Sequence, residues 1–303
     1  MTAPQAHLFS RVARRDLVSV RLEIRAALYL GVLLLTGGIA LFIEENRERL
    51  GPAAIGLAIF VLAAGCLVWA WRKSPSFTWG DTLSTHAGFD YVLLLGALLV
   101  ATDLAYLETE TRILGANWPW HLFVVAAFYA ALAYRFDSRM LLSLALTSFA
   151  AWRGLAVSLL GTSLGVGDPA RLRAEALACG VLFVLIGVVA RRAGRKAHFE
   201  DVYVNGGLLL ALGGLLSGVF ARAGWGAWLV ALFLVAGATA FLAFRGSRTL
   251  PFALAVLAVW LGLQRLIFEG AGADASATLL VSAASAGSAI FFIVFAHRRM
   301  RIP

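Results

Sequence analysis

Apolar runs of about 17 to 22 residues recur ten times along this chain, and each is long enough to cross roughly 30 Å of hydrocarbon as a helix. A helix satisfies its own backbone hydrogen bonds in lipid, and the runs lack the alternation typical of a closed barrel. The sequence therefore predicts an all-α integral membrane protein of about ten transmembrane helices. The predicted helices cover residues 26–43, 51–71, 89–107, 117–134, 140–160, 174–190, 202–221, 226–244, 250–268 and 276–296.

Composition agrees with lipid as the main solvent. Of the 303 residues, 61% are hydrophobic and 14% are charged, whereas about a quarter of the residues in a soluble domain are charged. The apolar surplus must face a bilayer, which is the first predicted partner. Cys66 and Cys179 lie inside apolar runs, so we interpret them as small core residues rather than as metal ligands.

The basic residues are distributed unevenly between the two sides of the predicted helices. Eighteen of the 26 Lys and Arg residues lie on the side that holds both termini, six lie on the other side, and two fall within helices. Because basic loops stay in the cytoplasm, this bias predicts a multi-pass protein of the bacterial cytoplasmic (inner) membrane with both termini cytoplasmic. The net charge of +9 is thereby explained without a nucleic-acid partner.

Two stretches of the sequence resemble each other. "HLFVVAAFYAALAYRFDSRMLLSLALTSFAAWRGL" and "WLVALFLVAGATAFLAFRGSRTLPFALAVLAVWLGL" both read as helix, basic turn, helix. We predict a cytoplasmic basic segment, 1–25, followed by a single ten-span membrane domain, 26–303. Within that domain we predict a duplicated four-helix unit, 51–160 and 174–268, with extra helices at 26–43 and 276–296. The alternative is an inverted five-plus-five repeat, as in many transporters.

Motifs that carry chemistry are mostly absent from the sequence. The five histidines lie at termini or helix ends, and no two have metal-ligand spacing. No nucleophile elbow appears, and the glycines near residue 165 lack the strand and Lys-Ser/Thr of a phosphate-binding loop. We therefore predict no cofactor, no metal and no catalytic residue, which disfavours an enzyme without excluding one.

Polar residues within the apolar runs are the candidate binding residues, because such groups are costly in lipid and usually face the bundle interior. Four of the five candidates lie roughly 6 to 10 Å below the predicted outer boundary, at about 1.5 Å per residue, and Glu269 lies just beyond the end of its run. Three interpretations of Arg153 stay open: an ion pair with Asp103, extension of its long side chain to the outer headgroups, or a ligand site. The candidates are Asp103, Arg153, Gln264, Arg265 and Glu269.

Glycines in the segment "NGGLLLALGGLLSG" predict close helix packing. Gly214 and Gly218 are four residues apart, and Gly207 lies two turns earlier, so the three mark one predicted packing face.

The first apolar run carries a family resemblance. "YLGVLLLTGGIALFIEENRERL" resembles the opening span of an uncharacterised family of bacterial multi-spanning membrane proteins, a domain of unknown function. The matching residues are Tyr29, Gly31, Leu33, Leu34, Gly37, Phe42 and Asn46. This chain has Arg47 where the family often has Trp, and its N-terminal region is shorter. The resemblance covers mainly residues 29–50 and implies no activity and no functional residue.

Two classes of function fit these features. The first is a non-catalytic subunit or scaffold that associates with other membrane proteins or with copies of itself. The alternative is a transporter or binding protein for a small anionic or amphipathic solute with an outward-facing charged site. A polar cavity bounded by Asp103, Arg153 and Arg265 would favour the alternative, and a dry bundle would favour the subunit.

Overall fold

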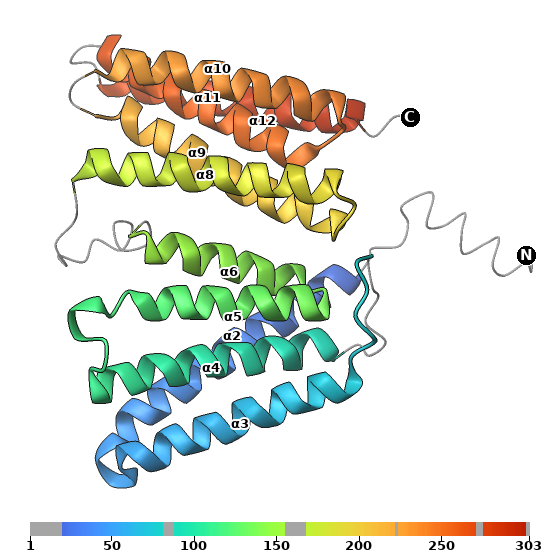
Figure 1. The fold of residues 1–303 in the computed structure, drawn as a ribbon. Helices are drawn as coiled ribbons and strands as arrows, with labels where there is room; N and C mark the ends of the chain where they lie inside the picture. Colours follow the sequence, from blue (N-terminus) through green and yellow to red (C-terminus); the bar gives the residue numbers. More distant parts are fainter. Residues whose placement is uncertain (1–19, 81–87, 155–167, 222–223, 271–274, 301–303) are drawn as a thin grey trace, which may run out of the picture. The chain divides into compact units, whose positions relative to one another are not determined.

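The computed structural model describes residues 20–80, 88–154, 168–221, 224–270 and 275–300, and these ranges form ten α-helices and no strand (Figure 1). The helices are α2 (Val20–Leu50), α3 (Pro52–Lys73), α4 (Phe89–Thr111), α5 (Trp120–Phe136), α6 (Arg139–Trp152), α8 (Pro169–Arg192), α9 (Glu200–Val219), α10 (Trp225–Arg245), α11 (Thr249–Gly270) and α12 (Ala275–Met300). The all-helical prediction is confirmed for this part of the chain. Residues 1–19 of the predicted basic segment and 155–160 of the fifth predicted helix lie outside it.

Six helices are long and apolar enough to cross a membrane: α3, α4, α8, α9, α10 and α11. The apolar parts of α2, α5, α6 and α12 within the described residues are shorter. The 14 residues of α6 extend about 21 Å, less than the thickness of the hydrocarbon core. The chain therefore has the helices of a membrane-embedded protein, of which six individually meet the length and composition of a span.

The fifth predicted helix, 140–160, differs from the structure at its C-terminal end. Instead of continuing, α6 ends at Trp152 and Arg153 caps it. The cause is Gly154, whose φ of 84° cannot continue a right-handed helix and whose N–H donates to Ala151 O at 2.9 Å. Arg153 therefore follows a helix rather than lying two turns inside one.

Contacts divide the chain into two compact units. Unit 1, residues Met1–Pro75 and Leu83–Trp118, contains α2, α3 and α4, which all contact one another. Its core consists of Ile55, Ile59 and Ala63 from α3 with Leu99 from α4. The predicted single ten-span domain with duplicated four-helix units remains a prediction.

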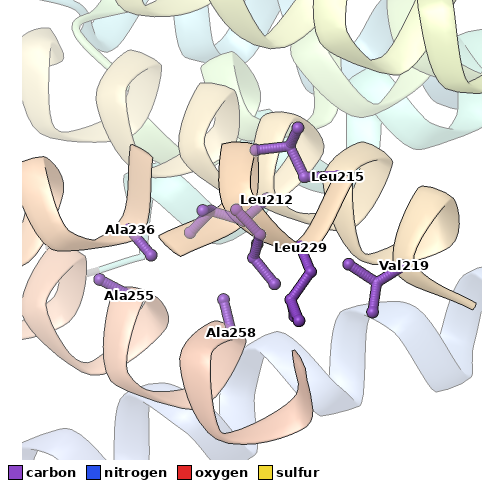
Figure 2. Packing of buried hydrophobic residues seen from close by; sticks show 8 residues of the cluster. Leu212, Leu215, Val219, Leu229, Ala236, Ala255 and Ala258 are labelled. Atoms are coloured by element: carbon purple, nitrogen blue, oxygen red, sulfur yellow. The ribbon is translucent and has the colours of Figure 1, made fainter. Parts of the chain in front are cut away.

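Unit 2, residues Ser76–Thr82 and Pro119–Pro303, contains the other seven α-helices that the structure describes. Consecutive helices pair as α5 with α6, α8 with α9, and α10 with α11, and α9 also contacts α6, α10 and α11. Figure 2 shows the buried cluster where α9, α10 and α11 meet, with leucines of α9 and α10 packed against small residues of α11. The labelled members are Leu212, Leu215, Val219, Leu229, Ala236, Ala255 and Ala258.

Glycines bring α8 and α9 into direct backbone contact. A methyl group added at Gly207 would lie 2.6 Å from the carbonyl oxygen of Gly180, and one added at Gly180 would lie 2.7 Å from Gly207 O. A methyl group added at Gly214 would lie 3.3 Å from Ala176 Cβ, and Gly218 lies against the ring of Trp228. Gly207 and Gly214 thus occupy the face of α9 that contacts α8, whereas Gly218 accommodates an aromatic side chain of α10.

We expect Gly207→Ala to destabilise the protein by about 1–3 kcal/mol, because the new methyl group meets rigid backbone on α8. Labelling of the buried Cys179 thiol during heating, in a Cys66→Ala background, would show a midpoint lower by about 2–4 °C per kcal/mol. The matched control is Gly213→Ala on the same helix, where nothing lies within 4 Å of the added group. Equal midpoints for the two variants would contradict the contact.

Candidate functional site

Four of the five predicted site residues have hydrogen-bond partners in the structure. Arg153 contacts Glu175 of α8: Nε donates to Glu175 Oε2 at 3.0 Å and Nη2 forms a shorter contact with the same oxygen. Its guanidinium also lies 5.3 Å from the centre of the Trp152 ring. The carboxylate that Arg153 contacts within unit 2 is therefore Glu175, which was not among the predicted site residues. The ion pair with Asp103, one of three interpretations left open by the sequence, stays a prediction.

Arg265 and Glu269 pair with each other along α11. Nη2 of Arg265 donates to Glu269 Oε1 at 2.7 Å, and the guanidinium lies 5.8 Å from the ring of Trp225. Gln264 is buried and donates from Nε2 to Ser285 Oγ of α12 at 3.0 Å. Gln264 and Arg265 thus connect α11 to α12 and to α10, whereas Glu269 pairs within α11.

Asp103 lies in unit 1, on the face of α4 that contacts α3. A methyl group at Gly56 would lie 3.7 Å from Asp103 Oδ1. The side chain is 8% exposed, and Oδ1 has no hydrogen-bond partner among the described residues. Asp103 is the predicted site residue whose carboxylate lacks a cation within salt-bridge distance in the described structure.

A buried charged cluster lies at the turns of unit 2. Lys196 Nζ lies 3.0 Å from Asp137 Oδ1, and His198 Nε2 lies 2.5 Å from the same oxygen. The side chains of Lys196 and Asp137 are 2% and 1% exposed. In such a site the attraction between the two charges offsets the loss of hydration only while both partners remain.

Left-handed backbone turns bring these charges together. Asp137 (φ 62°) ends α5, and Lys196 (φ 49°) follows the turn after α8. Each turn is closed by a hydrogen bond spanning five residues, from Ser138 N to Ala133 O at 3.1 Å and from Arg195 N to Ala190 O at 3.2 Å. Asp tolerates this conformation well, but a left-handed Lys is uncommon and must be held by its surroundings.

Residues 76–80 provide part of those surroundings. Lys196 N donates to Trp79 O at 2.9 Å, and its Nζ donates to Gly80 O at 3.4 Å. The ammonium lies 5.4 Å from the Phe77 ring centre, and the Arg195 guanidinium lies 5.2 Å from that of Trp79. The segment thus covers Lys196 with two carbonyl oxygens and an aromatic face.

Glu200 forms a second charged cluster at the start of α9. Its two oxygens accept from Arg191 Nη1 at 3.1 Å and from Arg248 Nη2 at 3.0 Å, which joins α8, α9 and the turn before α11. The hydrogen bond to Glu200 raises the pKa of the Arg248 guanidinium above its ordinary value, so Arg248 stays charged. One carboxylate is thereby shared by two cations, so it neutralises half of their charge.

These clusters are suited to holding helices together rather than to catalysis. Asp137 and Glu200 each receive two donors, and Lys196 has both a carboxylate and a carbonyl partner. Among the residues that the structure describes, no three His, Cys, Asp or Glu side chains are grouped so that they could hold a metal ion. Both carboxylates are occupied by donors, so neither is directed at open space as a general base.

A groove of about 600 Å³ lies in unit 2, and its lining is predominantly apolar. Its residues come from α6, α8, α9 and α11, and its polar members are Ser143, Thr147 and Asn205. None of the five predicted binding residues lines it. The lining is Ser143, Leu146, Thr147, Ala150, Ala151, Phe183, Val202, Asn205, Gly206, Leu209, Leu210, Leu250 and Leu254.

Sequence reasoning missed the cluster of Asp137, Lys196 and His198. A signal was present, because Asp137 is an acidic residue in a turn that is otherwise basic, "YRFDSR". Its partners lie about 60 residues away in the next basic turn, and no helical periodicity connects two turns. The groove left no comparable signal, since its residues also fit ordinary helix packing.

We expect Asp137→Leu to destabilise unit 2 by about 3–5 kcal/mol, because it leaves the Lys196 ammonium buried without its carboxylate. Adding Lys196→Met should restore most of the loss, which a double-mutant cycle with the Cys179 labelling assay would measure. Additive effects of the two substitutions would contradict a coupled pair.

We expect Arg153→Leu to cost at most about 1 kcal/mol, because Arg153 is 37% exposed on its side chain. Its effect should couple with that of Glu175→Gln and add independently to that of Asp103→Asn. The same thermal assay on the two double-mutant cycles distinguishes these partners, and coupling to Asp103 alone would show that the Glu175 pair is wrong.

Comparison with known proteins leaves the function to be argued from this geometry. No protein-family model, no curated protein and no solved structure matches the chain. The family resemblance of residues 29–50 therefore stays a prediction.

Proposed function

We propose that this chain is a non-catalytic polytopic membrane protein that acts as a subunit or scaffold and associates with other membrane proteins. In this proposal its ten helices span the bacterial cytoplasmic membrane with both termini in the cytoplasm. The distribution of basic residues supports the orientation, and the six long apolar helices support the placement in a membrane.

The observation that carries the proposal is the pairing of charge within the chain. Arg153, Arg265, Lys196 and Arg248 each contact a carboxylate of the same chain. The groove in unit 2 is lined by no charged residue. A transport pathway for an anion needs cations that face a water-accessible cavity. The four cations named above instead contact carboxylates, and none of them lines the groove.

Large apolar side chains on several helices remain exposed. They are available to lipid and to the helices of a partner, and small residues beside them would allow close approach. Examples are Leu57, Phe60 and Val61 on α3, Leu234, Phe241 and Leu242 on α10, and Ile290, Phe291 and Phe292 on α12.

Binding of a small amphipathic solute is the second candidate. The groove in unit 2 favours it, because sites for such ligands are mostly apolar with a few polar groups, and 600 Å³ is within their usual size. The predicted outward-facing charged residues would not form this site, since none of them lines the groove.

Photocrosslinking in intact cells tests the association. A photoreactive residue in place of Phe60, Leu242 or Phe291 should give a discrete protein adduct from at least one of these helices. The controls replace buried residues of two of the same helices, Ile59 on α3 and Leu232 on α10, which are 2% and 0% exposed and should give none. Adducts with lipid alone from all three exposed positions would contradict the subunit role.

A further inference from the structure

The groove in unit 2 has the dimensions of a site for a single flexible chain. Its walls extend from Ser143 to Ala151 on α6 and from Val202 to Leu210 on α9, which is about 12 Å along each helix. A helix about 10 Å across would fill 600 Å³ within roughly five residues, so a partner helix cannot lie along the full groove. Leu209 and Leu250 line the groove and are 60% and 53% exposed, so it opens at the apolar surface of unit 2. In a bilayer, the molecules that reach such an opening are lipids.

The three polar residues of the groove are grouped within its lining. Ser143 and Thr147 are one helical turn apart on α6, and Asn205 lies on α9. Leu146, between the first two, lies 3.5 Å from a methyl group added at Gly206, the residue after Asn205. At about 1.5 Å per residue, the three lie roughly 6 to 12 Å from the starts of their helices.

The part of the groove farther from those helix starts is apolar. It consists of leucines of α9, alanines of α6 and one aromatic ring of α8, whereas two apolar residues lie nearer to the starts. The farther residues are Leu209, Leu210, Ala150, Ala151 and Phe183, and the nearer ones are Val202 and Leu250.

The polar residues have hydrogen-bonding capacity that the described residues do not use. Ser143 Oγ donates to Met140 O at 2.7 Å and Thr147 Oγ1 donates to Ser143 O at 2.9 Å, so both hydroxyl oxygens keep lone pairs that can accept. Asn205 Oδ1 is buried and accepts no hydrogen bond from any residue that the structure describes. Rotation about the last side-chain bond of Asn205 presents either its oxygen or its amino group to a ligand. A hydroxyl group complements all three side chains, because it donates one hydrogen bond and accepts two.

The groove offers no counterion to a charged head group. No charged residue of the described part of the chain lines it. In the turns near the helix starts, Asp137 pairs with Lys196 and Glu200 pairs with Arg248, and Arg139 also interacts with a neighbour. A charged head group would therefore lose its hydration in the groove without gaining a partner, so the occupant is uncharged.

We infer that this groove binds an uncharged single-chain lipid that ends in a hydroxyl group. The hydroxyl lies beside Ser143, Thr147 and Asn205, and the hydrocarbon chain follows the apolar lining away from the helix starts. Ligand sites of this kind are mostly apolar, with a few polar groups that fix the orientation of the ligand. The inference deepens the second candidate above, because it names the class of solute, and it does not depend on association with other proteins.

Photolabelling of the full chain in detergent tests where the lipid chain lies. The probe is hexadecanol that carries a diazirine in mid-chain, and mass spectrometry of peptides should locate the label on the helices that line the groove. Gly206→Leu places a side chain in the groove, and its first added carbon lies an ordinary 3.5 Å from Leu146 Cδ1. Labelling should fall about fivefold or more in this variant. The matched control is Gly237→Leu on α10, outside the lining and with nothing within 4 Å of the added carbon, which should label like the wild type.

Competition against the same probe tests what the polar residues select. In the wild type, hexadecanol should compete about fivefold better than hexadecane, as expected for one hydrogen bond worth about 1 kcal/mol. Asn205→Leu replaces the amide with an apolar side chain of similar size and should abolish that preference. Ser288→Ala on α12 is the control, because its hydroxyl is also bonded to its own helix but lies outside the groove, and it should keep the preference.

Three results would overturn the site. They are equal labelling of Gly206→Leu and Gly237→Leu, a preference for hexadecanol that Asn205→Leu leaves unchanged, and stronger competition by the anionic hexadecyl phosphate than by hexadecanol. The Cys179 labelling midpoint of each variant shows that it is folded. Protein adducts from the photocrosslinking positions above test the association role separately, so their loss would contradict that role without affecting this site.

Discussion

A backbone in lipid must make its hydrogen bonds within its own segment, and the rest of this structure depends on that constraint. Because the long apolar runs all form helices, the backbones of these helices make the same pattern of hydrogen bonds. The differences arise where helices end and where their surfaces lack side chains. In unit 2, Gly180 and Gly207 let two backbones touch, while left-handed residues such as Asp137 and Lys196 direct charge into the turns. The arrangement is thus set by its smallest residues and its turns.

The buried pair of Lys196 and Asp137 shows how such turns constrain packing. A buried ion pair gives little net stability over apolar packing, but loss of one partner is costly. The pair therefore requires a specific placement of the turn after α5 against the turn after α8. Glu200 adds a second constraint, because it accepts hydrogen bonds from Arg191 of α8 and from Arg248 in the turn before α11. Together they define one geometry for the hairpins of unit 2, where apolar packing alone would permit several.

Much of the fold could be predicted from hydropathy, because the positions of the apolar runs follow directly from solvation. The end of α6 could not, since Gly154 stops the helix through a backbone angle within a run that stays apolar. Nor could the partner of Arg153, because Glu175 lies on another helix and a pair of charges leaves no periodic signal. Asp137 and Lys196 meet only once the hairpins have packed. The groove is the space between α6, α8, α9 and α11, so the sequence of no single helix predicts it.

The position of residues 76–80 has a consequence for biosynthesis. This segment precedes α4 of unit 1, yet it belongs to unit 2, and Gly80 accepts a hydrogen bond from a residue 116 positions later. At a translation rate of about 5–20 residues per second, the ribosome adds Lys196 roughly 6 to 23 seconds after this segment. During that interval Phe77 and Trp79 are without their cationic neighbours. The rings of Phe77 and Trp79, which stay 44% and 50% exposed in the finished fold, therefore acquire their cationic contacts only after the turn that follows α8 has been made.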